Sequence, residues 1–123
     1  MKRDMDIIRM ILMQQETGQA PPELAKYPED LVVYNVALMK DAGLLVAEIR
    51  ADHEGSPRGA VIIRLTWAGH DFLDATRNDT VWNTAKEKIL RSGASWTFDL
   101  LKDCLKALAG QQLAKIGLPG FDQ

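Results

Sequence analysis

The first candidates for catalysis or metal binding in this sequence are two histidines, one cysteine and three serines. His70 precedes Asp71, an order that suggests an acid–base pair. Because neighbouring residues of a helix point about 100° apart, these two side chains do not form the hydrogen-bonded pair that general-base catalysis requires. We therefore expect His70 to lie on or near the surface without a catalytic role.

The other reactive side chains are scattered along the chain. His53, His70 and Cys104 lack any recognised spacing of metal ligands. The segment GSPRG has neither the length nor the lysine of a phosphate-binding loop. Three serines in turn or cap contexts lack the pattern of a nucleophile elbow: Ser56, Ser92 and Ser95. The sequence therefore predicts no catalytic residue, no metal and no cofactor, and a protein that is not an enzyme.

Length and composition indicate an ordinary globular domain. The chain has 123 residues, of which 46% are hydrophobic and 26% charged. Its net charge of −2 disfavours non-specific coating of nucleic acid but does not exclude a local basic patch. A single cysteine is typical of a reducing compartment, so we expect a cytoplasmic protein. No apolar run reaches the roughly 20 residues that span a bilayer, and no membrane partner is expected.

The first half of the chain reads as helix, connector, helix and hairpin. Apolar residues at helical spacing predict a helix over about 5–16 and a second over about 28–42, separated by a proline-containing connector with little regular structure. Two β-rich runs, 44–50 and 60–65, flank a separator that contains Gly55, Pro57 and Gly59, which predicts a hairpin. In the second run we expect one face to be covered by the rest of the fold, formed by Val61, Ile63 and Leu65.

Three further helices are predicted after the hairpin. Thr66 is placed to cap a helix to about residue 77, in which Gly69 allows a close approach to the sheet and Phe72 and Leu73 reach the core. Thr80 is expected to cap the next helix and Ser95 the last one. We treat residues 1–93, the hairpin core with its following helix, and residues 94–123, an amphipathic helix and tail, as parts of one domain.

The order of these elements resembles a winged-helix domain, a helix-turn-helix variant with a β-hairpin wing. KDAGLL at 40–45, followed by a hairpin and LTWAGHDFL at 65–73, resembles the junctions of that superfamily. More narrowly, MKRDMDIIRMIL, LMKDAGLL, LTWAGHDFLDATRNDTVWNTAKEKI and SWTFDLLK are similar to one family of small bacterial and prophage proteins, which carries only the label "domain of unknown function". The resemblance covers nearly the whole chain. It implies an α+β, mostly helical fold with a winged helix-turn-helix-like core and additional C-terminal helices.

DNA binding by a regulatory protein is the first function that this resemblance implies. In typical winged helices the second helix of the motif reads the major groove, but segment 28–43 carries one lysine against three carboxylates, which phosphates repel. The proline-rich connector also departs from the pattern of the superfamily. Double-stranded DNA would then be contacted mainly through the wing, and the candidate residues are Arg50, Arg58, Arg64, Lys26, Lys40 and Asn35.

The alternative is a protein-interaction module on the same scaffold, such as a phage or prophage adaptor or inhibitor that touches no DNA. Helices outside the motif often form dimer interfaces, so a homodimer is expected. Tryptophan is favoured at interface hot spots, although core packing is the ordinary role of such residues. The interface candidates are Trp67, Trp82, Trp96, Phe98, Leu101, Leu105 and Leu108. A cluster of arginines and lysines on one face would favour DNA, and an exposed apolar patch around a tryptophan would favour a protein partner.

Overall fold

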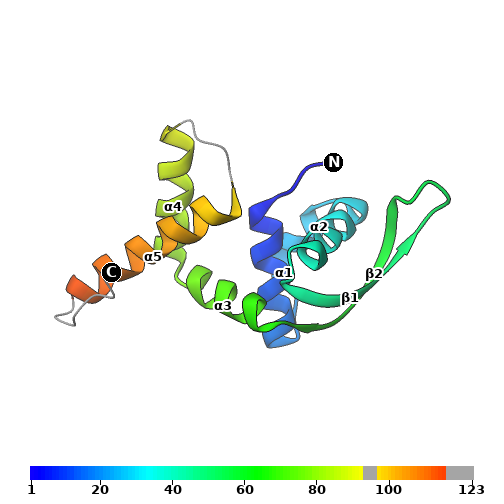
Figure 1. Ribbon diagram of the computed structural model, residues 1–123, viewed down its shortest axis with the longest axis horizontal. Coiled ribbons are helices and arrows are strands. Elements are labelled where there is room, and N and C mark those ends of the chain that lie inside the picture. The colour runs from blue at the N-terminus through cyan, green and yellow to red at the C-terminus, as the bar shows by residue number, and fades with distance from the viewer. Residues whose placement is uncertain (93–96, 116–123) are drawn as a thin grey trace. The chain divides into compact units, whose positions relative to one another are not determined.

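The computed structural model describes residues 1–92 and 97–115 of the chain (Figure 1). Within these ranges the fold is α+β and mostly helical, as the sequence predicts, and it forms two compact units, 1–73 and 74–123. The elements in chain order are α1 (Met5–Thr17), the 3-10 helix η1 (Pro22–Lys26), α2 (Glu29–Asp41), β1 (Leu45–Ala51), β2 (Pro57–Leu65), α3 (Trp67–Thr76), α4 (Asp79–Ser92) and α5 (Phe98–Lys115). None of the helices in the described ranges has the length and apolarity that crossing a membrane requires.

The start of α1 is capped by Asp4. The carboxylate of Asp4 accepts hydrogen bonds from the backbone N–H groups of Asp6 at 2.9 Å and Ile7 at 3.2 Å, donors that no earlier turn can pair. The helix ends at Gly18, whose φ of 79° suits a residue without a Cβ atom. The buried face of α1 consists of Met5, Ile7, Ile8, Ile11 and Leu12.

Asn35 of α2 holds the start of the chain against that helix. Its side chain is fully buried, and its Oδ1 accepts a hydrogen bond from the backbone N–H of Asp4 at 2.8 Å. Its Nδ2 donates to the carbonyl oxygens of Leu31 at 3.0 Å and Lys2 at 3.4 Å. The amide thus satisfies both of its polar ends inside the protein, as a buried polar group must. It links the cap of α1 to the middle of α2.

The hairpin pairs β1 with β2 in antiparallel order, and its phase differs from the sequence prediction. Leu45 lies opposite Leu65 and Val46 opposite Arg64, but Ala47 lies opposite Ile62. Ile63 is therefore the extra residue of a β-bulge, which reverses the alternation of side chains along β2.

The bulge separates residues that were expected to share a face. Leu65 is buried and Ile62 is half-buried, whereas Val61 and Ile63 are largely exposed. The prediction that Val61, Ile63 and Leu65 form one covered face is wrong for this reason. An inserted residue shifts the alternation of side chains by one position, so residues two apart along β2 no longer all face the same side.

The start of α3 is fixed to the junction between α2 and β1. Leu44 accepts a hydrogen bond from the N–H of Thr66 at 3.0 Å, and the Thr66 hydroxyl donates to the carbonyl oxygen of Gly43. The same hydroxyl accepts from the N–H of Gly69 at 3.1 Å, which confirms Thr66 as the cap. A Cβ atom at Gly69 would lie 1.9 Å from the Leu44 carbonyl oxygen, so this contact requires glycine.

Most of the other predictions for α3 are also confirmed. Phe72 and Leu73 are each 1% exposed, and His70 is exposed. Gly69 was expected to let α3 approach the sheet. The group that it approaches is instead the backbone carbonyl of Leu44, at the junction between α2 and β1.

In the second unit α4 packs against α5 through apolar side chains. The cap of α4 is Asn78, whose Oδ1 accepts from the N–H of Val81 at 3.0 Å, and not Thr80 as predicted. The start of α5 is capped by Thr97, whose hydroxyl accepts from the N–H of Leu100 at 3.1 Å. Ser95, the predicted cap, lies outside the described residues. Both corrections shift a helix start by two residues, because several neighbouring polar residues are competent caps.

Replacing Asn35 with alanine is expected to lower the free energy of unfolding by about 2 kcal/mol, because the N–H of Asp4 then loses its acceptor. Urea denaturation followed by circular dichroism measures this change. Asn83→Ala, an exposed position of α4, is the control and should stay within about 0.5 kcal/mol of the wild type. Equal stability of the two variants would contradict the role assigned to Asn35.

Gly69→Ala is expected to destabilise the protein by about 2 kcal/mol or more, since the added methyl group overlaps the carbonyl of Leu44 and forces the backbone to move. Gly110→Ala is the matched control, because a Cβ atom there meets nothing within 4 Å. The control should gain up to about 1 kcal/mol from helix propensity. Thermal unfolding of both variants distinguishes the two signs, and a neutral Gly69→Ala would disprove the close approach.

Candidate functional site

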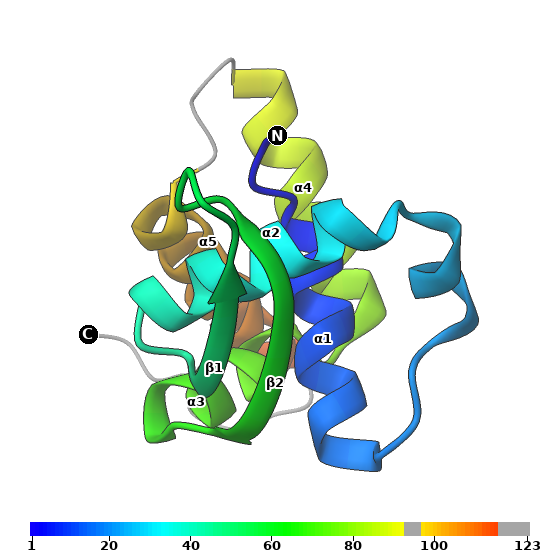
Figure 2. The ribbon, with the colours of Figure 1, turned by 90° about the vertical axis from the view of Figure 1, so that its right-hand side faces the viewer.

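The hairpin has one face covered by helices and one face open. α2 contacts both strands and α1 contacts β2, so the covered face carries Ala47, Ile62 and Leu65. Figure 2 shows α2 behind the hairpin, whose other side is turned toward the viewer. We call this other side the outer face, and its residues are Val46, Glu48, Arg50, Gly59, Val61, Ile63 and Arg64.

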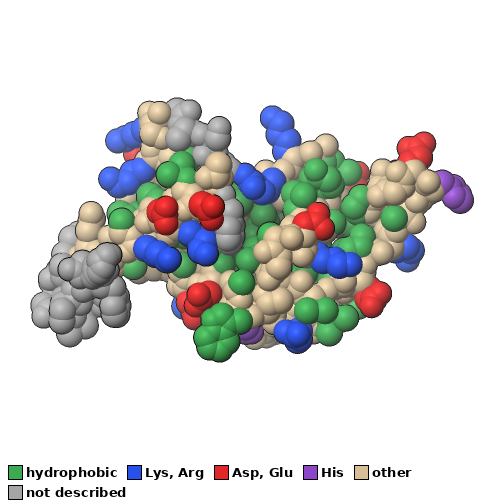
Figure 3. All heavy atoms as spheres, viewed as in Figure 1, with side chains coloured by type: hydrophobic (Ala, Val, Ile, Leu, Met, Phe, Trp, Pro, Cys, Tyr) green, Lys and Arg blue, Asp and Glu red, His purple; other side chains and the backbone are tan. Residues whose placement is uncertain are grey.

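The outer face exposes apolar side chains that continue onto the first residue of α3. Val61 is 66% exposed and Ile63 57%, and Trp67, two residues after the end of β2, is 87% exposed. Figure 3 shows hydrophobic side chains along the lower edge of the molecule, over β2 and the start of α3. Single exposed hydrophobic residues are common on protein surfaces, but several in one stretch that includes a tryptophan are typical of a binding surface.

Two arginines lie at opposite ends of this surface. Arg64 pairs across the strands with Val46 and Arg50 with Gly59, a separation of four β1 residues or about 13 Å. The Arg50 guanidinium lies over Gly59, since its Nη2 is 2.7 Å from the position of a Cβ atom there. Glu48, opposite Val61, stands between them. The outer face therefore combines an apolar centre with cationic ends and one internal carboxylate.

The loop that joins the strands is organised by Asp52. Its Oδ1 accepts from the N–H groups of Glu54 and Ser56, both at 2.9 Å, and its Oδ2 accepts from Nε of Arg58 at 2.9 Å. Gly55 completes the turn with a φ of 85°. Arg58, expected at the tip of the wing as a DNA contact, thus lies in an ion pair with Asp52, which cancels its charge locally.

The hydrogen bond from the Ser56 N–H is the largest cause that lowers the pKa of Asp52 below its ordinary value of 3.8. Partial desolvation acts in the opposite direction, and the Arg58 guanidinium and the Glu54 N–H lower the pKa further. The carboxylate is thus the form that holds the loop together.

The other predicted DNA contacts are dispersed. Asn35 is buried with its amide fully used, so it does not reach a base edge. Lys26 and Lys40 are exposed, but Lys26 precedes α2 and Lys40 lies in its last turn. The length of α2, about 20 Å, separates them. Between residues 45 and 65 the three arginines are balanced by three carboxylates.

The interface candidates of the second unit are mostly interior. Trp82 and Leu101 are 1% and 0% exposed, and Leu105 and Leu108 are buried as well. These residues pack within the chain, so they do not present a free apolar stripe, and for Trp82 core packing is the correct interpretation. Trp96 and the side chain of Phe98 lie outside the described residues.

The surface residues that sequence reasoning missed are Val61 and Ile63. Both were assigned to the covered face, and no residue type in the sequence marks the bulge that turns them outward. The sequence left open whether Trp67 lies in the core or on the surface, and its exposure shows that it lies on the surface.

The residues with catalytic potential are not gathered into a metal site. Within the described ranges no group of three or more His, Cys, Asp and Glu side chains could hold a metal ion.

The contribution of Asp52 to the stability of the loop is expected to be complete well above its ordinary pKa of 3.8 and to be lost as the pH falls through the lowered pKa. Amide NMR shifts of Glu54 and Ser56 should titrate together, with a midpoint below 3.8. Asp52→Asn should abolish this titration, whereas Asp41→Asn, outside the loop, should leave it unchanged. A midpoint at or above 3.8 would be inconsistent with the hydrogen bonds described.

Comparison with known proteins finds one family that spans most of the chain. Residues 2–95 match the family described as "Hypothetical protein (DUF2513)". The chain is also 34% identical over 121 residues to an uncharacterized protein of Haemophilus influenzae, an alignment that covers 93% of this chain and all of that protein. No solved structure matches the fold significantly. The family match includes α1, α2, the hairpin, α3 and α4, and on this evidence the chain belongs to the DUF2513 family.

Proposed function

We propose that this protein is a non-enzymatic interaction module on a winged-helix-like scaffold, which binds a partner protein through the outer face of its hairpin and Trp67. The sequence of α1, η1, α2, hairpin and α3 supports the scaffold, because it follows the order helix, short helix, helix, wing and helix. The observation that carries the function is the 87% exposure of Trp67, which follows the exposed Val61 and Ile63 within a few residues of the chain.

A protein partner fits this surface better than DNA does. Burying Trp67, Val61 and Ile63 against apolar groups releases water from a large hydrophobic area, the main driving force of protein association. DNA instead requires several free cations along its phosphates. On the hairpin one arginine is paired with Asp52, and the charge of the other two is partly offset by Glu48 and Glu54.

The helix that would read the major groove also disfavours DNA. α2 carries Glu29 and Asp30 in its first turn, and its asparagine points into the core. Exposed acidic residues at that position repel phosphate. DNA binding through the hairpin, the other function expected from the sequence, therefore has weaker support.

The partner surface can be described by its chemistry. It presents an apolar strip to Val61, Ile63 and Trp67, with carboxylates near each end that pair with Arg50 and Arg64. A second copy of this chain satisfies part of this description, since Glu48 of one copy can pair with an arginine of the other. A homodimer is accordingly one form that the complex can take.

Trp67→Ser is expected to weaken partner binding about 30-fold, the loss that follows truncation of a hot-spot residue. Partners captured from extracts of the native host are purified and titrated calorimetrically against the wild type and the variant, and sedimentation tests self-association. Leu90→Ser is the matched control, because Leu90 is 67% exposed on α4, outside the outer face. Both variants should have a free energy of unfolding within about 0.5 kcal/mol of that of the wild type.

Two outcomes would overturn the proposal. One is a purified partner that binds the wild type and Trp67→Ser equally. The other is saturable binding to random-sequence duplex DNA that weakens steeply with salt and disappears in Arg50→Glu or Arg64→Glu, with no protein bound by the outer face. Duplex binding is measured by fluorescence anisotropy across a salt series.

A further inference from the structure

In the described part of the chain, no strand pairs with the second edge of β2. The sheet contains two strands in the order β1–β2, so β2 pairs along one edge with β1. Figure 2 shows β1 on one side of β2 and α1 on the other. Among the described residues, no backbone–backbone hydrogen bond outside the hairpin ladder involves residues 57–65. Such an edge presents a row of N–H and C=O groups that another extended chain can use.

The connector between α1 and α2 forms no strand, and its composition disfavours pairing with this edge. Pro21 and Pro22 lack the N–H group that a strand must donate, and η1 begins at Pro22. The described backbone hydrogen bonds of this segment are local, such as the one from the N–H of Leu24 to the carbonyl of Pro21 at 3.0 Å. The edge is therefore left for a chain from outside.

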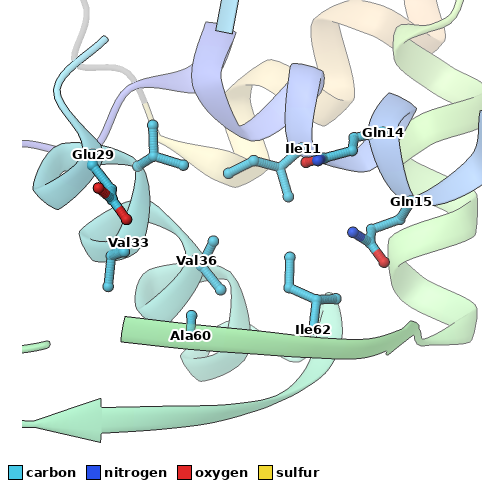
Figure 4. Close-up of a pocket in the computed structure, with 9 residues that line it drawn as sticks. Ile11, Gln14, Gln15, Glu29, Val33, Val36, Ala60 and Ile62 are labelled. Carbon is cyan, nitrogen blue, oxygen red and sulfur yellow. The ribbon is translucent and has the colours of Figure 1, made fainter. Parts of the chain in front are cut away.

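A groove adjoins the same strand. It has a volume of about 320 Å³ and lies between the second half of α1, the first half of α2 and the covered face of β2. Figure 4 shows Ala60 and Ile62 directed from β2 into this groove, toward Ile11 and Val36. The remaining lining residues are Gln14, Gln15, Glu29, Val32 and Val33. Most of these lining residues are apolar, and the polar groups of the lining come from Gln14, Gln15 and Glu29.

Two bulges limit the regular part of the edge. The ladder skips Ile63 at one end and Arg58 at the other, so the uninterrupted stretch is 59–62. A strand of about four residues can pair along it. Because side chains alternate, two of its residues would face the groove beside Ala60 and Ile62. The other two would extend the outer face beside Val61.

Charge defines the ends of the added strand. Glu29 is the acidic residue of the groove lining and lies over the Ala60 end, whereas Gln15 lies over the Ile62 end. Glu29 is exposed, and Asp30 follows it in the first turn of α2. A lysine or arginine at the matching end of the incoming strand would pair with this carboxylate.

We infer that the partner contributes an extended segment of about four apolar residues with a flanking lysine or arginine, which adds to β2 as a third strand beside the groove. This inference rests on the proposed function, since the same strand extends the outer face with its alternate side chains. Backbone hydrogen bonds supply part of the affinity, and the groove selects the side chains.

The test uses a synthetic peptide, acetyl-Lys-Val-Val-Val-Val-Lys-amide, titrated into the full chain and followed by NMR. We expect saturable shifts of the backbone amides of residues 59–62 and slower hydrogen exchange there. The matched control is the same peptide with N-methyl groups on alternate backbone amides, namely those whose N–H groups would point toward β2. It keeps the side chains but loses two hydrogen-bond donors, and should bind about tenfold more weakly.

A charge exchange tests the position of the flanking cation. Glu29→Lys should weaken the peptide about threefold, and a peptide with glutamate in place of both lysines should recover this loss on the variant. Equal binding of the N-methylated peptide, shifts confined to residues other than 59–62, or no shift at millimolar peptide would each overturn strand addition.

The failure of strand addition is distinguishable from a failure of the proposed function. If Trp67→Ser abolishes partner binding but the peptide leaves residues 59–62 unchanged, the interaction module stands and the added strand does not. If the partner binds Trp67→Ser and the wild type equally, the proposed function also fails.

Discussion

The β-bulge at Ile63 sets the phase of β2, and both faces of the hairpin depend on it. Without the extra residue, Leu65 in the core would place Val61 and Ile63 in the core as well, and Ile62 would face solvent. With it, Leu65 and Ile62 both face the helices, and two β-branched residues lie in water. Exposing them has a cost in hydrophobic free energy of about 1 kcal/mol or more for each side chain. A partner that covers these two side chains would recover this free energy on binding.

The bulge is effective because the far end of β2 is fixed. Thr66 and Gly69 tie the start of α3 to the carbonyls of Gly43 and Leu44, and the contact at Gly69 leaves no room for a side chain. Because these contacts hold the backbone that follows Leu65, the inserted residue is accommodated within the hairpin. The junction also directs Trp67, the first residue of α3, away from the core.

The buried amide of Asn35 has the corresponding role at the other end of the first unit. It joins the capped start of α1 to α2 and thereby uses the side chain that could have read a base. The acidic first turn of α2 remains exposed, beside a groove instead of a phosphate backbone. These two facts move the candidate site from the helix, where it would lie in a typical DNA-binding winged helix, to the hairpin.

The sequence by itself determined the type and order of the α-helices and strands, but not the 3-10 helix η1, which lies in the connector expected to have little regular structure. The spacing of apolar residues in α1, the glycines at positions 18 and 43, and the turn residues of the hairpin act locally, so they are visible in one dimension. The close approach at Gly69 and the exposure of His70 could be predicted in the same way. Cap positions were less certain, because Asn78 and Thr80 compete within two residues of each other.

Tertiary structure alone decided which residues form the site. The exposure of Trp67 and the burial of Asn35 and Trp82 depend on how helices pack, which involves segments that are far apart in the sequence. The bulge at Ile63 arises from pairing with a second strand, and no residue type signals it. Local free-energy preferences fix a helix or a turn, but only the sum of distant contacts decides which of its sides meets water.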